Sequence, residues 1–334
     1  MKKTKILIVF DMPFTPPENQ KDYLPLLKEK GWEDERDLFR TLNANPGFEV
    51  RMCGVFNNIN NMIDAITDFK PALIFPICES FANTRGGGAN LVGIIELMGI
   101  RYTGASASTL AICRNKSLAK KVLHYHNIAT PQFLEFSYSI KHEDTVGLLF
   151  PAIVKPRDLE ASEELTKKSV VLSKDACVRQ VNHLISKGHN VIVEQFIEGR
   201  EIYLGVIGDQ NPVILPPWEL SFGKAQLPHK EFATYKVKWD NKYRKQQNIK
   251  THKARNLNAK TTHKLSTIAK ETVQAFGLKG YSRLDLRLTE SGQPYLLEVN
   301  PNPAINRRDE FAKSAKSAGI SYRHLLNKII ELAI

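Results

Sequence analysis

The chain has 334 residues, of which 42% are hydrophobic, so it can form roughly two or three compact units with a sizeable core. Its formal net charge of +12 points to acidic partners. No apolar run reaches the roughly 18 residues of a membrane span, and the four cysteines are too scattered for a zinc site or a disulfide framework. The apolar run at residues 6–10 is too short for a signal peptide, so we expect a cytoplasmic protein with no membrane partner.

The first third of the chain alternates short apolar runs with amphipathic stretches. We expect strands at residues 5–10, 48–52, 72–76 and 100–104 and helices at residues 34–42, 59–69 and 89–98. Alternation of this kind predicts an α/β unit with a parallel sheet and crossover helices. Glu79 and Arg85 follow the third strand, at the edge where parallel sheets bind ligands, so they are candidate substrate contacts or simply polar loop residues.

The middle of the chain carries a lysine at the end of a strand. The run Phe150-Pro-Ala-Ile-Val-Lys-Pro156 is extended, and Lys155 can reach a phosphate while its stem lies on apolar neighbours. Residues 190–205 then predict a strand, an acidic turn and a second strand. Residues 221–260 hold eleven Lys and Arg against two acids, and this basic segment favours phosphates, acidic molecules or nucleic acid, unless it is a solvated, mobile loop.

A hairpin near the carboxyl end brings oxygen ligands together. With a period of two, Arg283 and Asp285 share one face of the first strand, and Glu298 and Asn300 share one face of the second. Two carboxylates and an amide oxygen form a hard ligand set that suits Mg²⁺, which completes its shell with water and phosphate oxygens. The alternative is an edge hairpin with solvated charges.

Taken in order, these segments resemble the ATP-grasp superfamily and, within it, the D-alanine–D-alanine ligase-like carboxylate–amine ligases. The matching segments lie at residues 96–104, 115–116, 150–156, 194–201, 235–239, 282–286 and 297–303. The resemblance implies an ATP-grasp fold, α/β with an α+β carboxyl-terminal half. It implies three parts: a Rossmann-like parallel-sheet domain (residues 1–115), a central subdomain (116–193) and a carboxyl-terminal domain with the metal site (194–334).

The resemblance also implies an ATP site. Lys116 and Lys155 would hold the phosphates, and Glu201 would hydrogen-bond the ribose. The hinge that meets adenine through its backbone would consist of Glu194, Gln195, Phe196 and Ile197.

The catalytic residues follow from the same resemblance. Asp285, Glu298 and Asn300 would bind two Mg²⁺ ions, with Mn²⁺ as a possible substitute. Arg283 would stabilise the oxyanion of the tetrahedral intermediate, and Lys238 would cover the γ-phosphate.

The sequence departs from the family on the substrate side. The flap over the phosphates, residues 157–168, contains no glycine, and Ser162 is the match to the family's flap serine. The motif that binds the first substrate's amine is absent after Phe10, and Cys78-Glu-Ser replaces a His-Gly loop. These differences argue against D-alanine as substrate. Arg307 and Arg308 are candidates for binding a substrate carboxylate, or are surface arginines.

We therefore expect an ATP- and Mg²⁺-dependent ligase that joins an amino-acid-like or peptide-like carboxylate to an amine through an acyl phosphate. The first alternative is a phosphotransferase on the same fold. The second is a basic nucleic-acid-binding protein, for which no recognition motif is present. The resemblance also suggests a homodimer through the N-terminal domain.

Overall fold

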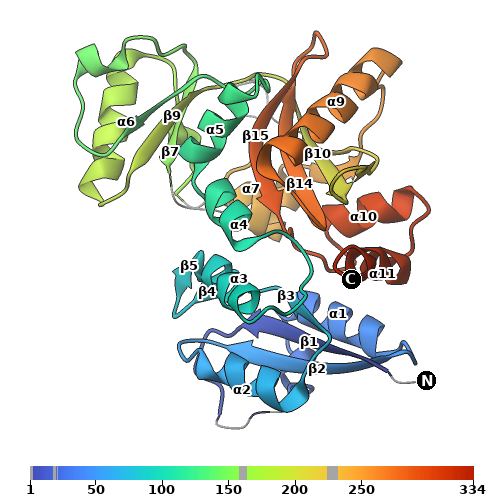
Figure 1. Cartoon of the computed structure of the whole chain (residues 1–334). Coiled ribbons are helices and arrows are strands. Elements are labelled where there is room, and N and C mark those ends of the chain that lie inside the picture. Colours follow the sequence, from blue (N-terminus) through green and yellow to red (C-terminus); the bar gives the residue numbers. More distant parts are fainter. Residues whose placement is uncertain (1–2, 18–19, 21, 158–163, 224–231) are drawn as a thin grey trace.

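The computed structural model describes residues 3–17, 20, 22–157, 164–223 and 232–334. Three sheets account for most of its strands, and they follow one another along the chain (Figure 1). The expected ATP-grasp architecture with an N-terminal parallel sheet is confirmed, while the exact division at residues 115 and 193 stays a prediction.

The N-terminal sheet is parallel and has helices on both faces. Strand β1 (Thr4–Asp11) lies between β2 (Phe48–Val55) and β3 (Leu73–Pro76). Alternate residues of β1 face opposite sides, so Ile6 and Ile8 pack toward α1 (Glu33–Asn43), and Leu7 and Val9 pack toward α2 (Asn60–Phe69) and α3 (Gly87–Leu97). Both faces of the sheet are buried, which explains why β1 is an uninterrupted apolar run.

The central sheet is small and antiparallel. Its order is β6 (Phe133–Phe136), β9 (Val191–Gln195), β7 (Ala152–Pro156) and β8 (Val170–Val171). Helix α6 (Lys174–Ser186) covers one face with Cys177, Val181 and Leu184.

The last sheet is antiparallel and carries the predicted hairpin. Its order is β13 (Ile249–Lys253), β12 (Trp218–Phe222), β10 (Arg200–Ile207), β14 (Tyr281–Leu288) and β15 (Pro294–Pro301), with β11 (Val213–Ile214) beside β10. Helix α9 (Ala259–Phe276) buries Leu284 and Leu286 of β14. The opposite face of β14 is left for its charged residues.

Several elements differ from the sequence-based expectation. Residues 100–104 run beside the edge strand β3 but form only an isolated parallel bridge, between Tyr102 and Ile74. The described part of the basic segment is not a loop. It contains the last two residues of β12, then α7 (Tyr235–Trp239), α8 (Asn241–Gln246) and β13. The chain also forms α4 (Ala107–Arg114) before α5 (Lys116–Tyr125).

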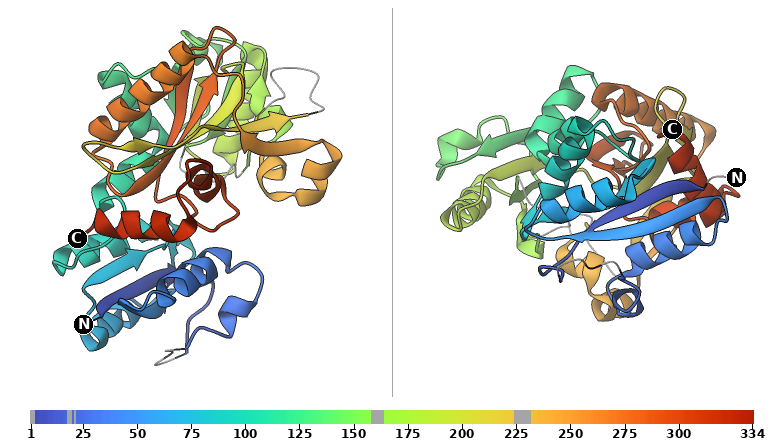
Figure 2. Two further views of the ribbon diagram at one scale, coloured as in Figure 1. Left: turned by 90° about the vertical axis from the view of Figure 1, so that its right-hand side faces the viewer. Right: turned by 60° about the horizontal axis from the view of Figure 1, so that its bottom comes forward.

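The first and last sheets are joined through the final helices. Helices α10 (Glu310–Ser317) and α11 (Tyr322–Glu331) lie between the N-terminal sheet and the last sheet (Figure 2, left), and Leu325, Leu326 and Ile329 of α11 share a core with β1 and α1. Two short strands, β4 (Ser80–Phe81) and β5 (Thr84–Arg85), form a hairpin above β3. Among the described helices, none has the length and apolar character needed to cross a bilayer.

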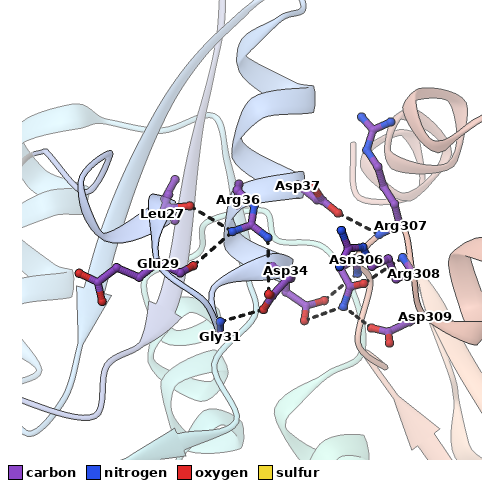
Figure 3. Close-up of polar contacts among 11 residues, drawn as sticks. Leu27, Glu29, Gly31, Asp34, Arg36, Asp37, Asn306, Arg307, Arg308 and Asp309 are labelled. Carbon is purple, nitrogen blue, oxygen red and sulfur yellow. Dashed lines mark hydrogen bonds and ion pairs between the residues drawn. The ribbon is translucent and has the colours of Figure 1, made fainter. Parts of the chain in front are cut away.

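Polar contacts fix this joint. The Asp34 carboxylate at the start of α1 accepts hydrogen bonds from the backbone N–H groups of Ile305 and Asn306, each at 2.7 Å (Figure 3). The Asn302 side-chain oxygen accepts a hydrogen bond of 2.9 Å from the backbone N–H of Ala105. The segment after β15 is thus attached to the N-terminal part at two points.

Candidate active site

The charged face of the β14–β15 hairpin forms the centre of the site. Asp285 lies directly opposite Glu298, and Arg283 lies directly opposite Asn300, as the alternation predicts. Arg283 binds the Asp285 carboxylate with two hydrogen bonds of 2.7 and 3.0 Å. Two carboxylates, an amide and a guanidinium therefore share one side of the sheet.

Glu298 is held in its charged form by surrounding cations. The Lys116 ammonium lies 3.7 Å from it. Burial opposes ionisation of Glu298, but Lys116, Lys155, Lys238 and Arg283 outweigh this effect and lower its pKa to about 2. At neutral pH the site thus presents a carboxylate that can bind a metal ion.

A buried ion triad stands behind the hairpin. Glu194, 1% exposed, forms ion pairs with Lys155 at 2.8 Å and with Lys120 at 3.2 Å. Burial lowers the pKa of Lys120 to about 8, although Glu194 opposes this change. Lys120 also donates to the Thr130 hydroxyl at 3.0 Å. The sequence did not single out Lys120, because its partner comes from a distant strand.

A small cavity of about 80 Å³ adjoins this triad. Its lining includes the phosphate candidate Lys155, the ribose candidate Glu201 of β10 and the four hinge candidates, Glu194, Gln195, Phe196 and Ile197. Arg287, which the sequence reading left without a role, lies 3.2 Å from Glu201 and stacks on the ring of Phe196. The ion pair with Arg287 therefore fixes the position of the ribose candidate Glu201.

A larger cavity of about 780 Å³ lies between the hairpin and the N-terminal sheet. Lys116, Arg283 and Asn300 line it, as do the two candidates of the N-terminal loop, Glu79 and Arg85. Glu298 and Lys238 line both cavities, so the two spaces meet at these side chains.

The basic segment contributes cations to this meeting point. Lys238 comes from α7, whose start is capped by the Thr234 hydroxyl, and Arg244 comes from α8. Arg244 is fixed by hydrogen bonds of 2.9 Å to the Val237 carbonyl and to the Thr251 hydroxyl. Arg244 was not predicted, since only the helical geometry turns it toward the cavity.

Two of the candidates lie away from the large cavity. Neither Arg307 nor Arg308 belongs to the described residues that line the large cavity. The Arg307 guanidinium donates to the Thr41 hydroxyl at 2.9 Å and covers the Tyr322 ring, which is a contact between α1 and the segment after β15 (Figure 3). This geometry speaks against substrate binding by these arginines. Ser162 lies outside the described residues.

Comparison with known proteins identifies the family. A family model described as the D-ala D-ala ligase C-terminus matches residues 116–331, which is well over half of the chain. The chain belongs to the D-alanine–D-alanine ligase family. The resemblance expected from the motifs is thereby confirmed.

Relatives and solved structures of the D-alanine–D-alanine ligase family agree over most of the chain. A D-alanine–D-alanine ligase of Carboxydothermus hydrogenoformans is 30% identical over 75% of this chain and 78% of its own length. An uncharacterised protein of Sinorhizobium fredii is 31% identical over 72% of this chain and 68% of its own length. The crystal structure of Bacillus anthracis D-alanine–D-alanine ligase complexed with ATP superimposes with a TM-score of 0.74 at 21% identity, covering 100% of this chain and 97% of the other.

Proposed function

We propose that this member of the family, an ATP-dependent carboxylate–amine ligase, forms an amide through an acyl phosphate and uses substrates other than two D-alanines. The observation that carries the proposal is the junction of the two cavities at Glu298 and Lys238. A nucleotide whose base lies in the small cavity extends its terminal phosphate to this junction, where it meets a carboxylate substrate in the large cavity. Phosphoryl transfer needs this proximity more than any covalent help from the protein.

The hairpin residues fit magnesium by their chemistry. No group of three or more His, Cys, Asp and Glu side chains is arranged as a metal site within the described ranges, so an ion here relies on Asp285, Glu298 and the Asn300 amide. The buried Asn300 amide nitrogen has no hydrogen-bond partner among the described residues. If the Asn300 amide is turned so that its nitrogen and oxygen exchange places, the oxygen occupies this position and can bind a metal ion. One or two Mg²⁺ ions bound here would offset the charge of the phosphates.

The lysines suit nucleotide binding. Lys155 is charged, since Glu194, Glu298 and Glu201 together outweigh burial and raise its pKa. We assign the phosphates to Lys116, Lys155 and Lys238, adenine to the backbone of Glu194, Gln195, Phe196 and Ile197, and the ribose to Glu201. The buried triad keeps the hinge strand and Lys155 in register with one another.

The chemistry then proceeds in two steps. A substrate carboxylate oxygen attacks the γ-phosphorus, and the bond to ADP breaks, which leaves an acyl phosphate. The amine attacks the acyl carbon as a free base, the C–N bond forms, the bond to phosphate breaks, and the amine's proton passes to phosphate or water. Arg283, which lines the large cavity beside Asp285, is placed to stabilise the oxyanion of the second step.

The departure from D-alanine rests on the sequence differences at the loops after Phe10 and at Cys78-Glu-Ser. Glu79 and Arg85 line the large cavity and remain our candidates for the carboxylate substrate. A homodimer and a cytoplasmic location remain predictions.

The test is a coupled ADP-release screen of amino acids, dipeptides and other small amines, taken in pairs, with Asp285→Asn and Glu298→Gln as variants. We expect at least one pair to support ADP and phosphate release, and each variant to lose at least about 10²-fold in rate. Glu49→Gln on the exposed edge of β2 is the matched control and should retain full rate.

Two outcomes contradict the proposal. ADP release that needs no amine and yields no free phosphate would indicate a phosphotransferase. Unchanged turnover in both variants would remove the hairpin from the reaction.

A further inference from the structure

The end of the large cavity beyond Arg283 is acidic. Asp34 and Glu35 of α1 line it from the N-terminal side, and Asp309 and Glu310 line it from the start of α10. Glu310 lies close enough to Arg283 to contribute to the raised pKa of that guanidinium. The acidic end therefore begins beside Arg283, the residue that we propose stabilises the oxyanion.

These carboxylates make no direct ion pair in the described part of the chain, although Arg283 and Lys313 lie close enough to Asp309 to oppose the rise of its pKa. Asp34 accepts its hydrogen bonds from the backbone of Ile305 and Asn306, and Asp309 accepts from the Asn306 amide at 2.5 Å (Figure 3). Within the described ranges, none of the four forms an ion pair with Lys or Arg. Their negative charge is thus available to something that enters the cavity.

The position of the two acids on α10 matters as much as their number. A helix N-terminus with free N–H groups attracts a carboxylate. Here Asp309 occupies the N-cap and Glu310 the first helical position, and the Asp309 side chain does not cap the helix. A substrate carboxylate arriving at this point would meet two like charges, which disfavours an amino acid as the amine.

A buried hydroxyl faces the same acids. Tyr281 is only 2% exposed, yet it lines the cavity, and its hydroxyl has no hydrogen-bond partner within the described part of the chain. Burial raises the pKa of Tyr281, and the charges of Asp34 and Glu79 raise it further. A protonated hydroxyl whose oxygen is free can accept a hydrogen bond from an ammonium group.

Repulsion between the carboxylates of the acidic end raises the pKa of two of them. Burial, followed by Asp34, Asp11 and Glu33, raises the pKa of Glu35 to about 7. Burial, followed by Asp34 and Glu310, raises the pKa of Asp309 to about 7. A cation bound among these carboxylates would offset their repulsion and lower the pKa of Glu35 and of Asp309.

The cavity is not acidic throughout. Arg85 and Arg114 line it from β5 and α4, on the side of the N-terminal loop. Charges of opposite sign thus lie on different walls, and the acidic wall is the one that continues from Arg283 along α10.

We propose that the amine substrate carries a second, protonated nitrogen, as a diamine does, and that Asp309 and Glu310, with Asp34 and Glu35, bind this distal cation. The inference rests on the ligase function proposed above. The reacting nitrogen then lies toward Arg283 and the acyl phosphate, and the distal nitrogen lies in the acidic end near Tyr281.

The experiment compares amines that differ only in the distal group. Three chain lengths are used, with glycine, β-alanine and 4-aminobutanoate set against 1,2-diaminoethane, 1,3-diaminopropane and 1,4-diaminobutane. Each is titrated calorimetrically into the protein loaded with Mg²⁺ and a non-hydrolysable ATP analogue, and each is supplied in the ADP-release screen with the same set of carboxylates. We expect at least one diamine to bind about tenfold more tightly than the amino acid of the same chain length. Its KM should be lower by a similar factor.

The double variant Asp309→Asn/Glu310→Gln keeps the shape of the site and should lose this preference, whereas the control Glu49→Gln should keep it. Retained binding of the ATP analogue shows that the variant is folded. The proposal is overturned if no diamine binds, if the acids bind equally well, or if the double variant still prefers the diamine. Selective diamine binding without turnover for any pair would instead preserve the cation site and refute the ligase assignment.

Discussion

Two neighbouring lysines on α5 show how strongly burial changes what a side chain does. Lys120 is 1% exposed and shares Glu194 with Lys155. Lys121, the next residue, forms an ion pair with Glu135 at the surface. Exposed pairs contribute about 0–1 kcal/mol to stability, whereas removing one member of a buried group leaves an uncompensated charge.

We predict that Lys120→Met lowers the free energy of unfolding by about 3–5 kcal/mol. It should also raise the KM for ATP, because Glu194 would draw Lys155 away from the phosphates. Lys121→Met is the matched control and should stay within about 0.5 kcal/mol of the parent. Denaturant unfolding and ATP titration measure both effects, and equal stabilities for the two variants would contradict the role of the triad.

At the residue scale, the sequence predicts what a single strand pair contains. The period of two placed Asp285 opposite Glu298 because a hairpin keeps its partners close in the chain. Lys120 and Arg287 were missed because their partners, Glu194 and Glu201, come from strands far along the sequence. Only the tertiary fold brings such pairs together.

At the scale of elements, the long apolar runs were predictable and the short polar ones were not. The runs of β1 and β10 and the hairpin β14–β15 carry a clear pattern. Helices α7 and α8 have six residues or fewer, and their basic composition resembles that of a loop. They are stabilised by caps, such as Asp240 accepting from the backbone of Tyr243, and by packing against β13.

A glycine at the junction of two elements supports a further prediction. Gly104 has φ +92°, and a Cβ there would clash with the Asn302 side chain that bonds Ala105. Gly99 also has a positive φ, +66°, but a Cβ there would have nothing within 4 Å. We expect Gly99→Ala to cost about 1 kcal/mol of stability, and Gly104→Ala to cost more than about 2 kcal/mol.

Thermal unfolding and ADP release measure the two variants side by side. Gly104→Ala should also reduce activity, because Asn302 follows the proposed metal ligand Asn300 by two residues. Equal losses in the two variants would show that the contact with Asn302 is not important.

At the scale of the whole molecule, the net charge of +12 conceals a separation of charge. Cations gather where the two cavities meet, while carboxylates line the far end of the large cavity. This pattern gives the basic composition a role at the proposed nucleotide site. The sequence could not reveal it, because Asp34 and Asp309 lie 275 positions apart and meet only through Asn306.

The acidic end predicts a pH dependence of stability. Glu35 has a pKa raised from 4.5 to about 7, so between these values the folded state binds a proton that the unfolded state has lost. The free energy of unfolding therefore falls as pH rises through this window. Glu35→Gln should gain stability over the parent as pH rises from about 4.5 to 7. Denaturant titrations at several pH values test this, with Glu49→Gln separating it from a change in net charge.

The double attachment of the segment after β15 has a mechanical consequence. Asn302 and Asn306 tie that segment to the N-terminal part within a few residues of Glu298 and Asn300. A rotation of the first sheet would therefore move the proposed metal ligands with it, so we expect the first and last sheets to behave as one rigid body. We then expect the central sheet to be the part that moves relative to this body when a nucleotide binds or leaves.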